Sequence, residues 1–108
     1  QNSTEDNITA TPNGGQPTAY QITAATSRVT VCATNADSVK LPPSKNSVGA
    51  RLLIINDGAA NLAVFPEGTA TIDGGSASAS VTITAGRRSL FVCQAAGAWQ
   101  SIGMAKST

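Results

Sequence analysis

Short runs of β-branched residues, separated by clusters of turn residues, set the strongest constraint on the fold of this chain. An amphipathic helix needs an apolar face that repeats every three or four residues, and no window after Ala19 supplies one. The regular spacing of the runs is typical of β-sandwiches, jelly rolls and barrels. We expect strands at 19–24, 27–33, 38–41, 50–56, 61–65, 79–84, 88–94 and 98–102. The sequence therefore predicts an all-β fold, an antiparallel β-sandwich or jelly-roll-like domain.

The 108 residues fit one domain with polar ends. Residues 1–18 are polar, lack apolar periodicity and contain prolines and a glycine pair, so we expect a flexible or extended N-terminal arm. Residues 19–103 form the expected β-sandwich domain, and residues 104–108 a C-terminal tail. Within the domain, 52–55 (LLII) is apolar on both faces, which predicts a central strand or one covered by a partner. A small core gains from such burial, so we expect a homo-oligomer.

The charge balance excludes several classes of partner. Charged residues make up 12% of the chain, about half of the usual ~25%. The formal net charge of +1 predicts no general attraction to nucleic acid or to an anionic membrane. No apolar run approaches the ~18 residues that a membrane-spanning helix needs. A surface rich in small polar residues and poor in charge favours close packing between protein subunits.

Catalysis and metal binding are not supported by the residue types present. The chain has no histidine, so a serine or cysteine nucleophile would lack its usual base. Asp57, Glu67 and Asp73 each precede a glycine, where a carboxylate is expected to cap a turn rather than to form a glycosidase pair or a calcium site. We therefore expect no enzymatic activity, no cofactor and no metal.

The two cysteines, Cys32 and Cys93, leave two interpretations open. Both lie in apolar runs expected to be strands, so they are either small buried hydrophobic residues or partners in a disulfide. Without histidine they cannot complete a tetrahedral zinc site. Strand spacing alone does not place two Cβ atoms within bonding range.

Several residues are candidates for contacts with a partner. The corner 65–73 ends one strand at Phe65-Pro66, turns, and returns through a second apolar residue to an Asp-Gly-Gly turn. We expect this corner and the N-terminal arm to form a docking face. Paired arginines in a tight turn are either solvated cations that keep a hairpin end soluble or a site for a phosphate or an acidic partner. The single tryptophan is either a core or interface anchor or a sugar-stacking platform. The candidate residues are Phe65, Glu67, Ile72, Asp73, Arg87, Arg88 and Trp99.

An ordered series of landmarks resembles a β-rich module found in virion proteins of tailed bacteriophages. The landmarks are Leu41-Pro42, Gly49, Asn56-Asp57-Gly58, Phe65-Pro66, Ile72-Asp73-Gly74, Ala85-Gly86 and Gly97-Ala98-Trp99. The resemblance covers about residues 38–103, and neither cysteine is one of its landmarks. It implies a non-enzymatic building block of the particle and carries over no catalytic residues.

For a chain this short, the resemblance implies a capsid decoration (cement) protein. Such a protein is expected as a homotrimer on the outer capsid surface of the virion, bound to the major capsid protein. The alternative is a tail-fibre, spike or surface adhesin domain that recognises a host carbohydrate through Trp99 and the acidic turns.

Overall fold

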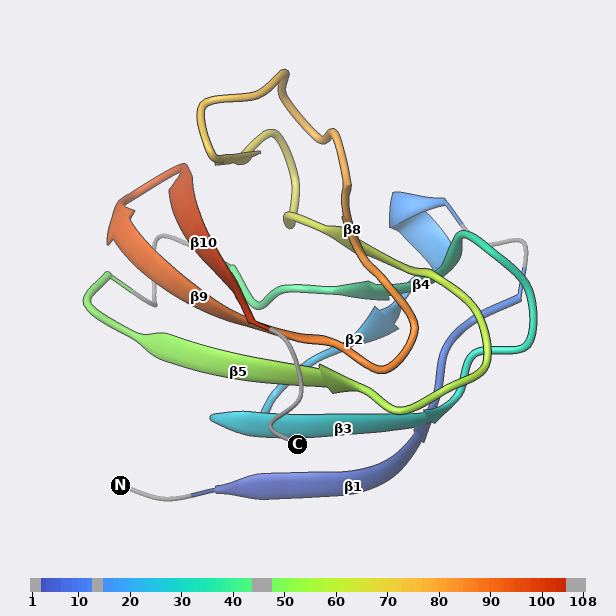
Figure 1. Ribbon diagram of the computed structural model, residues 1–108. Coiled ribbons are helices and arrows are strands. Elements are labelled where there is room, and N and C mark those ends of the chain that lie inside the picture. The colour runs from blue at the N-terminus through green and yellow to red at the C-terminus, as the bar shows by residue number, and fades with distance from the viewer. Residues whose placement is uncertain (1–2, 13–14, 44–47, 105–108) are drawn as a thin grey trace.

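Two β-sheets face one another across the core of the chain (Figure 1). The computed structural model describes residues 3–12, 15–43 and 48–104. One sheet has six strands in the order β1-β3-β5-β9-β10-β7. Their bounds are β1 (Thr4–Thr9), β3 (Thr26–Val31), β5 (Arg51–Asn56), β7 (Thr71–Ile72), β9 (Arg88–Ala95) and β10 (Ala98–Met104).

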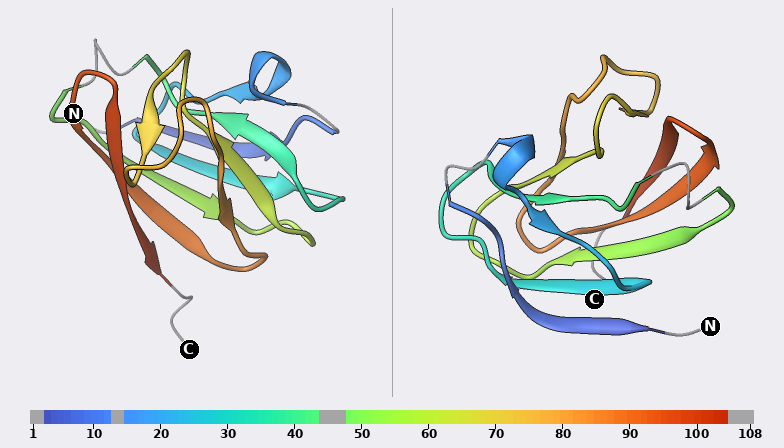
Figure 2. Two further views of the ribbon diagram at one scale, coloured as in Figure 1. Left: turned by 90° about the horizontal axis from the view of Figure 1, so that it is seen from above. Right: turned by 180° about the vertical axis from the view of Figure 1, so that it is seen from behind.

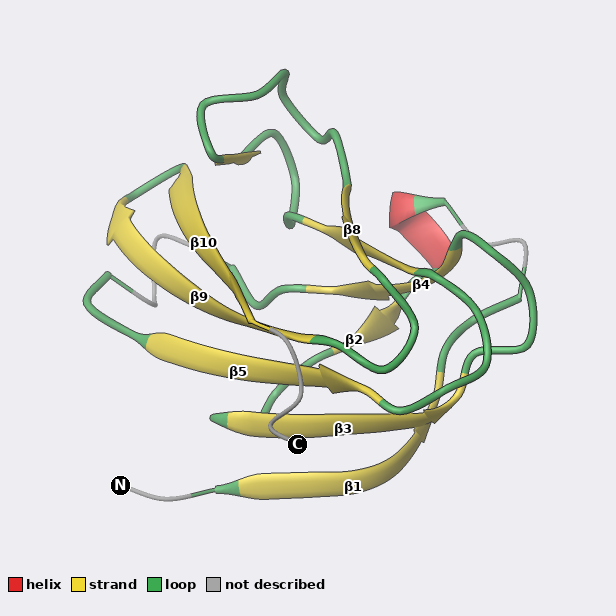
Figure 3. Ribbon diagram, in the orientation of Figure 1, coloured by secondary structure: helices red, strands yellow, loops and turns green. Residues whose placement is uncertain are grey.

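The second sheet has four strands in the order β2-β4-β6-β8 (Figure 3). Their bounds are β2 (Tyr20–Gln21), β4 (Asp37–Lys40), β6 (Leu62–Phe65) and β8 (Val81–Ile83). A short 3₁₀ turn, η1 (Gln16–Thr18), precedes β2, and the described residues contain no α-helix.

The chain winds between the two sheets in a solenoid-like path (Figure 2). Odd-numbered strands β1, β3 and β5 lie side by side and parallel in one sheet, while β2, β4 and β6 do the same in the other. The last third of the chain reverses direction: β8 runs antiparallel to β6, and β9 runs antiparallel to both β5 and β10. Residues of both sheets together form the hydrophobic core.

The all-β prediction and the two sheets are confirmed, but the expected antiparallel pairing is wrong for most strand pairs and a jelly-roll arrangement is not confirmed. Five of the eight strand pairs in the described part of the chain are parallel. A parallel neighbour requires a connection that crosses over, and here each connection carries the chain to the opposite sheet. Each of the eight residue ranges expected to be a strand overlaps a strand of the structure. β2 is shorter than expected, and β1 and β7 were not expected at all.

The N-terminal segment differs most from the sequence-based interpretation. The arm expected at 1–18 instead contributes β1, an edge strand that pairs with β3. Ile8 and Ala10 lie in the core with exposed fractions of 3% and 1%. The hydroxyl of Tyr20 donates a hydrogen bond to the carboxylate of Glu5, which ties β2 to β1. An edge strand with one large apolar residue gives no detectable period, which explains why the sequence did not reveal it. Of the expected tail 104–108, Met104 ends β10 and residues 105–108 lie outside the described part.

The central strand β5 has the two-sided burial expected of it. Leu52 and Ile54 point into the core, and Leu53 and Ile55 alternate with them on the outer face, where they are half-buried. At the end of the strand, the wholly buried Asn56 donates hydrogen bonds from its amide to the carbonyl oxygens of Ala60 and Ile83, both at 2.9 Å. With the donors of its buried amide satisfied by these hydrogen bonds, Asn56 joins β5 to the turn that follows and to β8 in the second sheet.

Candidate functional site: the outer face of the six-stranded sheet

A row of apolar side chains crosses the outer face of the six-stranded sheet. Leu53 lies directly opposite Leu90, and Leu90 directly opposite Ile102, on the adjacent strands β5, β9 and β10. Directly opposed side chains on one face of a sheet are in contact distance of one another. The four-stranded sheet packs against the opposite face (Figure 1), and Ile102 keeps 54% of its surface exposed. We call Leu53, Leu90 and Ile102 the outer row.

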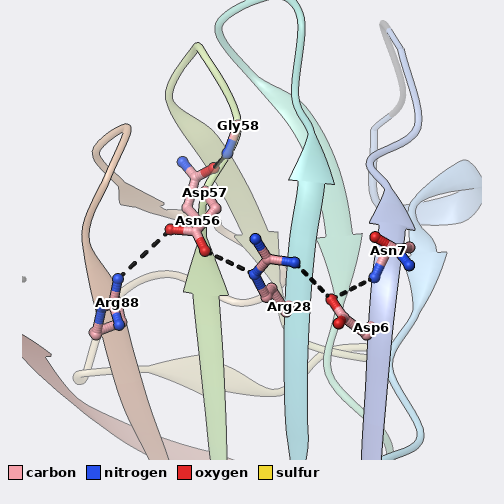
Figure 4. Close-up of polar contacts among 7 residues, drawn as sticks. All are labelled: Asp6, Asn7, Arg28, Asn56, Asp57, Gly58 and Arg88. Atoms are coloured by element: carbon pink, nitrogen blue, oxygen red, sulfur yellow. Dashed lines mark hydrogen bonds and ion pairs between the residues drawn. The ribbon is translucent and has the colours of Figure 1, made fainter.

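A chain of opposite charges crosses four strand positions (Figure 4). It lies beside the outer row, because Arg28 and Arg88 both pair with Ile55, two residues from Leu53. Asp6 on β1 accepts a hydrogen bond of 2.9 Å from Nη1 of Arg28 on β3. Nε of Arg28 donates at 2.8 Å to Asp57, just beyond β5, and the other oxygen of Asp57 lies 3.5 Å from Nη2 of Arg88 at the start of β9. We call Asp6, Arg28, Asp57 and Arg88 the charge ladder.

The ion pairs of the charge ladder shift the pKa values of two of its residues, and its charges sum to zero. The hydrogen bond from Arg28, followed by that from the backbone N–H of Asn7, lowers the pKa of Asp6 below its ordinary value of 3.8. The hydrogen bonds to Asp57 and then to Asp6 raise the pKa of Arg28. Two carboxylates and two guanidiniums cancel, so the charge ladder itself presents no net charge to a partner that covers the outer row. Because the Arg28 side chain is 41% exposed, solvent and salt screen these pairs, and their contribution to stability is small.

Sequence reasoning did not find these residues as a group. Leu53 was noted as part of an apolar run, and Arg88 and Asp57 as turn residues, but the pairing of β3, β5, β9 and β10 brings them to one face. The available signal was the outward position of Leu90 and Ile102 in runs whose alternate residues are buried.

The expected corner exists and is tied to the N-terminal segment. Phe65 ends β6 half-buried, and Ile72 in β7 is buried in the core. The side-chain amide of Gln16 in η1 donates hydrogen bonds of 2.7 Å and 2.6 Å to the carbonyl oxygens of Pro66 and Gly68. The half-buried Glu67 lies between these two residues. The corner and η1 thus form one hydrogen-bonded unit.

Asp73 acts in this corner as a turn residue. Its backbone adopts a φ of 56°, in the left-handed region, and its carboxylate accepts a hydrogen bond of 2.7 Å from the N–H of Ser101. The hydroxyl of Ser101 also donates to Asp73. The carboxylate of Asp73 therefore holds β10 in place.

Trp99 offers no ring face to a ligand. It is completely buried in the core, and its Nε1 is buried without a hydrogen-bond partner among the described residues. The interpretation of Trp99 as a sugar-stacking platform is therefore wrong for this structure. The remaining candidates do not form one surface with it, because Arg87 is exposed in the turn before β9 and Arg88 belongs to the charge ladder.

The two cysteines are thiols that are not joined in a disulfide, and they lie at opposite ends of β5. The carbonyl of Cys32 accepts from the N–H of Ala60, beyond the end of β5, whereas the N–H of Cys93 donates to Ala50, before its start. A six-residue strand separates these levels by roughly 20 Å, so the disulfide alternative is wrong. Burial raises the pKa of both thiols, and the nearby Asp37 raises that of Cys32 further.

The described residues contain no group of three histidine, cysteine, aspartate or glutamate side chains placed to hold a metal ion. In the same part of the chain, no helix is long and apolar enough to cross a membrane. Comparisons with protein-family models, with curated proteins and with solved structures find no match for this chain.

Proposed function

We propose that this chain is a non-enzymatic structural protein of a tailed-phage virion, a capsid decoration protein that binds the outer shell and stabilises it. The observation that carries the proposal is the outer row: three aligned apolar side chains on an open sheet face, bordered by charges that cancel. An apolar patch on a protein this poor in charge favours a protein partner.

The landmark series supports the same proposal, because its glycines occupy positions that the fold demands. Positive φ angles, a conformation that disfavours other residues, occur at four of them. These glycines are Gly49, Gly74, Gly86 and Gly97. Gly58 has a steric reason of its own, since a Cβ there would collide with Cys32. The landmarks of the resemblance thus include turns that shape this chain.

The occupant that we propose for the outer row is a second copy of the chain, within a homotrimer. In a trimer, copies of one surface can converge at the three-fold axis, and the charge ladder, whose charges cancel, does not oppose that contact. A trimer would also bind several capsid subunits at once, which raises the effective concentration of each later contact. The corner, fixed to η1 by Gln16, is the proposed contact with the major capsid protein.

The assembly is tested by sedimentation of the purified chain at micromolar concentration. We expect a trimer for the wild type and a shift toward the 10.8 kDa monomer for Ile102→Ser. Gln100→Ser is the matched control, because Gln100 is exposed on the same face of the same strand but lies outside the outer row. A wild-type monomer, or equal effects of the two variants, would contradict this use of the outer row.

The particle role is tested separately. Immunogold electron microscopy is applied to phage particles whose genome encodes the chain, with an antibody raised against the purified protein. Labelling over the head is the expected result. Labelling confined to the tail would favour the fibre or adhesin alternative, and unlabelled particles would exclude a virion role.

A further inference from the structure

A cleft of about 250 Å³ opens between the edge strand β8 and the β9–β10 hairpin. It is lined by Val81, Thr82, Ile83, Thr84, Arg87, Arg88, Ser89, Ser101 and Gly103. The two sheets do not close here for two reasons. β8 has only β6 as a neighbour in its sheet, and β7 pairs with β10 only at Ala98 and Trp99. The hairpin side also carries the small residues Ser89, Ser101 and Gly103, which leave room between the strands.

The lining is rich in hydrogen-bond donors and cationic. It contains two arginines, four residues with hydroxyl groups and no carboxylate. Two acids outside the lining contact it: Asp57 pairs with Arg88, and Asp73 accepts hydrogen bonds from Ser101. The positive charge that the cleft keeps without an ion pair among the described residues is therefore that of Arg87.

Arg87 is the cation that is available to a ligand. Its side chain is exposed, and none of the ion pairs formed by the described residues includes it. Arg88 uses Nη2 for Asp57, whereas its Nε is buried and has no hydrogen-bond partner among the described residues. A guanidinium presents several donors in a planar fork that suits a carboxylate or a phosphate.

We propose that this cleft binds a small hydroxylated organic anion, about the size of one sugar ring bearing a carboxylate or a phosphate. Arg87 would pair with the anionic group at the mouth of the cleft. The hydroxyl groups of Thr82 and Thr84 would exchange hydrogen bonds with ring hydroxyls, and Val81 and Ile83 supply an apolar wall. The volume lies just below the range of drug-sized pockets, which limits the ligand to a single ring. The inference does not depend on where in a particle the chain resides.

The test is a titration followed by two-dimensional ¹H–¹⁵N NMR of the full chain. The probes are glucuronic acid for the carboxylate, glucose 6-phosphate for the phosphate, and glucose as the neutral ring. We expect at least one of the two anionic probes to shift the amide signals of 81–84, 87–89 and 101–103 in a saturable way, with no such shift for glucose. Whichever anion binds more tightly identifies the preferred group.

Arg87→Gln should weaken the binding of the anion about tenfold or more, because a charge-assisted pair is lost. Arg51→Gln is the control, since it removes the same charge from an exposed arginine at the start of β5, which is not in the cleft. The side chain of Arg87 makes no ion pair in the described structure, and the dispersion of the variant's spectrum checks its fold. No shifts in the cleft, equal shifts with glucose, or equal losses in both variants would overturn the proposal.

Discussion

Gly58 and Cys32 lie so close together that a Cβ on Gly58 would be 2.6 Å from the Cβ of Cys32 and 2.7 Å from its backbone nitrogen. No side chain fits there without a shift of the backbone. The Asn-Asp-Gly turn after β5 therefore needs glycine for space, and the charge ladder depends on that turn because Asp57 belongs to it.

Gly58→Ala should consequently destabilise the protein by about 1–3 kcal/mol through overpacking, measured as the free energy of unfolding in urea. Gly103→Ala is the control, because a Cβ at that position meets no atom within 4 Å. A wild-type stability for Gly58→Ala would show that the close approach is not a constraint.

Substitution of single side chains in β1 should show that the N-terminal segment is part of the fold. Ile8→Ala deletes a core side chain that is 3% exposed, and we expect a loss of about 2–5 kcal/mol. Thr9→Ala changes an exposed neighbour on the same strand and should cost no more than about 0.5 kcal/mol. Equal, small losses in denaturant unfolding would restore the interpretation of residues 1–18 as an independent arm.

The charge ladder predicts a pH dependence at its β1 end. Because the pKa of Asp6 is lowered in the folded protein, its contribution to stability is present above its ordinary pKa of 3.8 and is lost as the pH falls through the lower, folded value. Unfolding measured between pH 6 and pH 2 should show a smaller acid-induced loss for Asp6→Asn than for the wild type. The difference should shrink in 1 M salt, and a salt-independent difference would contradict an ion pair.

The thiols should be inert in the folded chain. Burial raises the pKa of Cys32 and Cys93, so little thiolate forms at neutral pH. We expect no reaction with a thiol reagent under native conditions and two equivalents of reaction after unfolding, with a melting temperature that does not change on addition of a reductant. A chain that remains unreactive when unfolded would contain the disulfide that the structure excludes.

The sequence revealed the strands with alternating or continuous apolar residues, such as β5 and β9, because burial imposes a pattern that is visible locally. It could not reveal β1, where Ile8 is the one large apolar residue of the strand. The sequence could not reveal parallel pairing either, because a strand has the same alternation of apolar residues whether its neighbour is parallel or antiparallel. The charge ladder was beyond reach for a further reason: Asp6, Arg28, Asp57 and Arg88 are distant in sequence, and only the strand order brings them together. Trp99 was ambiguous because its residue type suits both a core and a binding platform.

The neighbours of β5 determine when a newly synthesised chain can complete its fold. One edge of β5 is covered early by β3, but its other partner, β9, begins only at Arg88. Until β9 has left the ribosome, one edge of the six-residue strand β5 keeps its backbone groups unpaired. Most of the contacts that complete the six-stranded sheet are therefore non-local, which slows folding. A chain truncated before β9 should collect in aggregates rather than as a folded fragment.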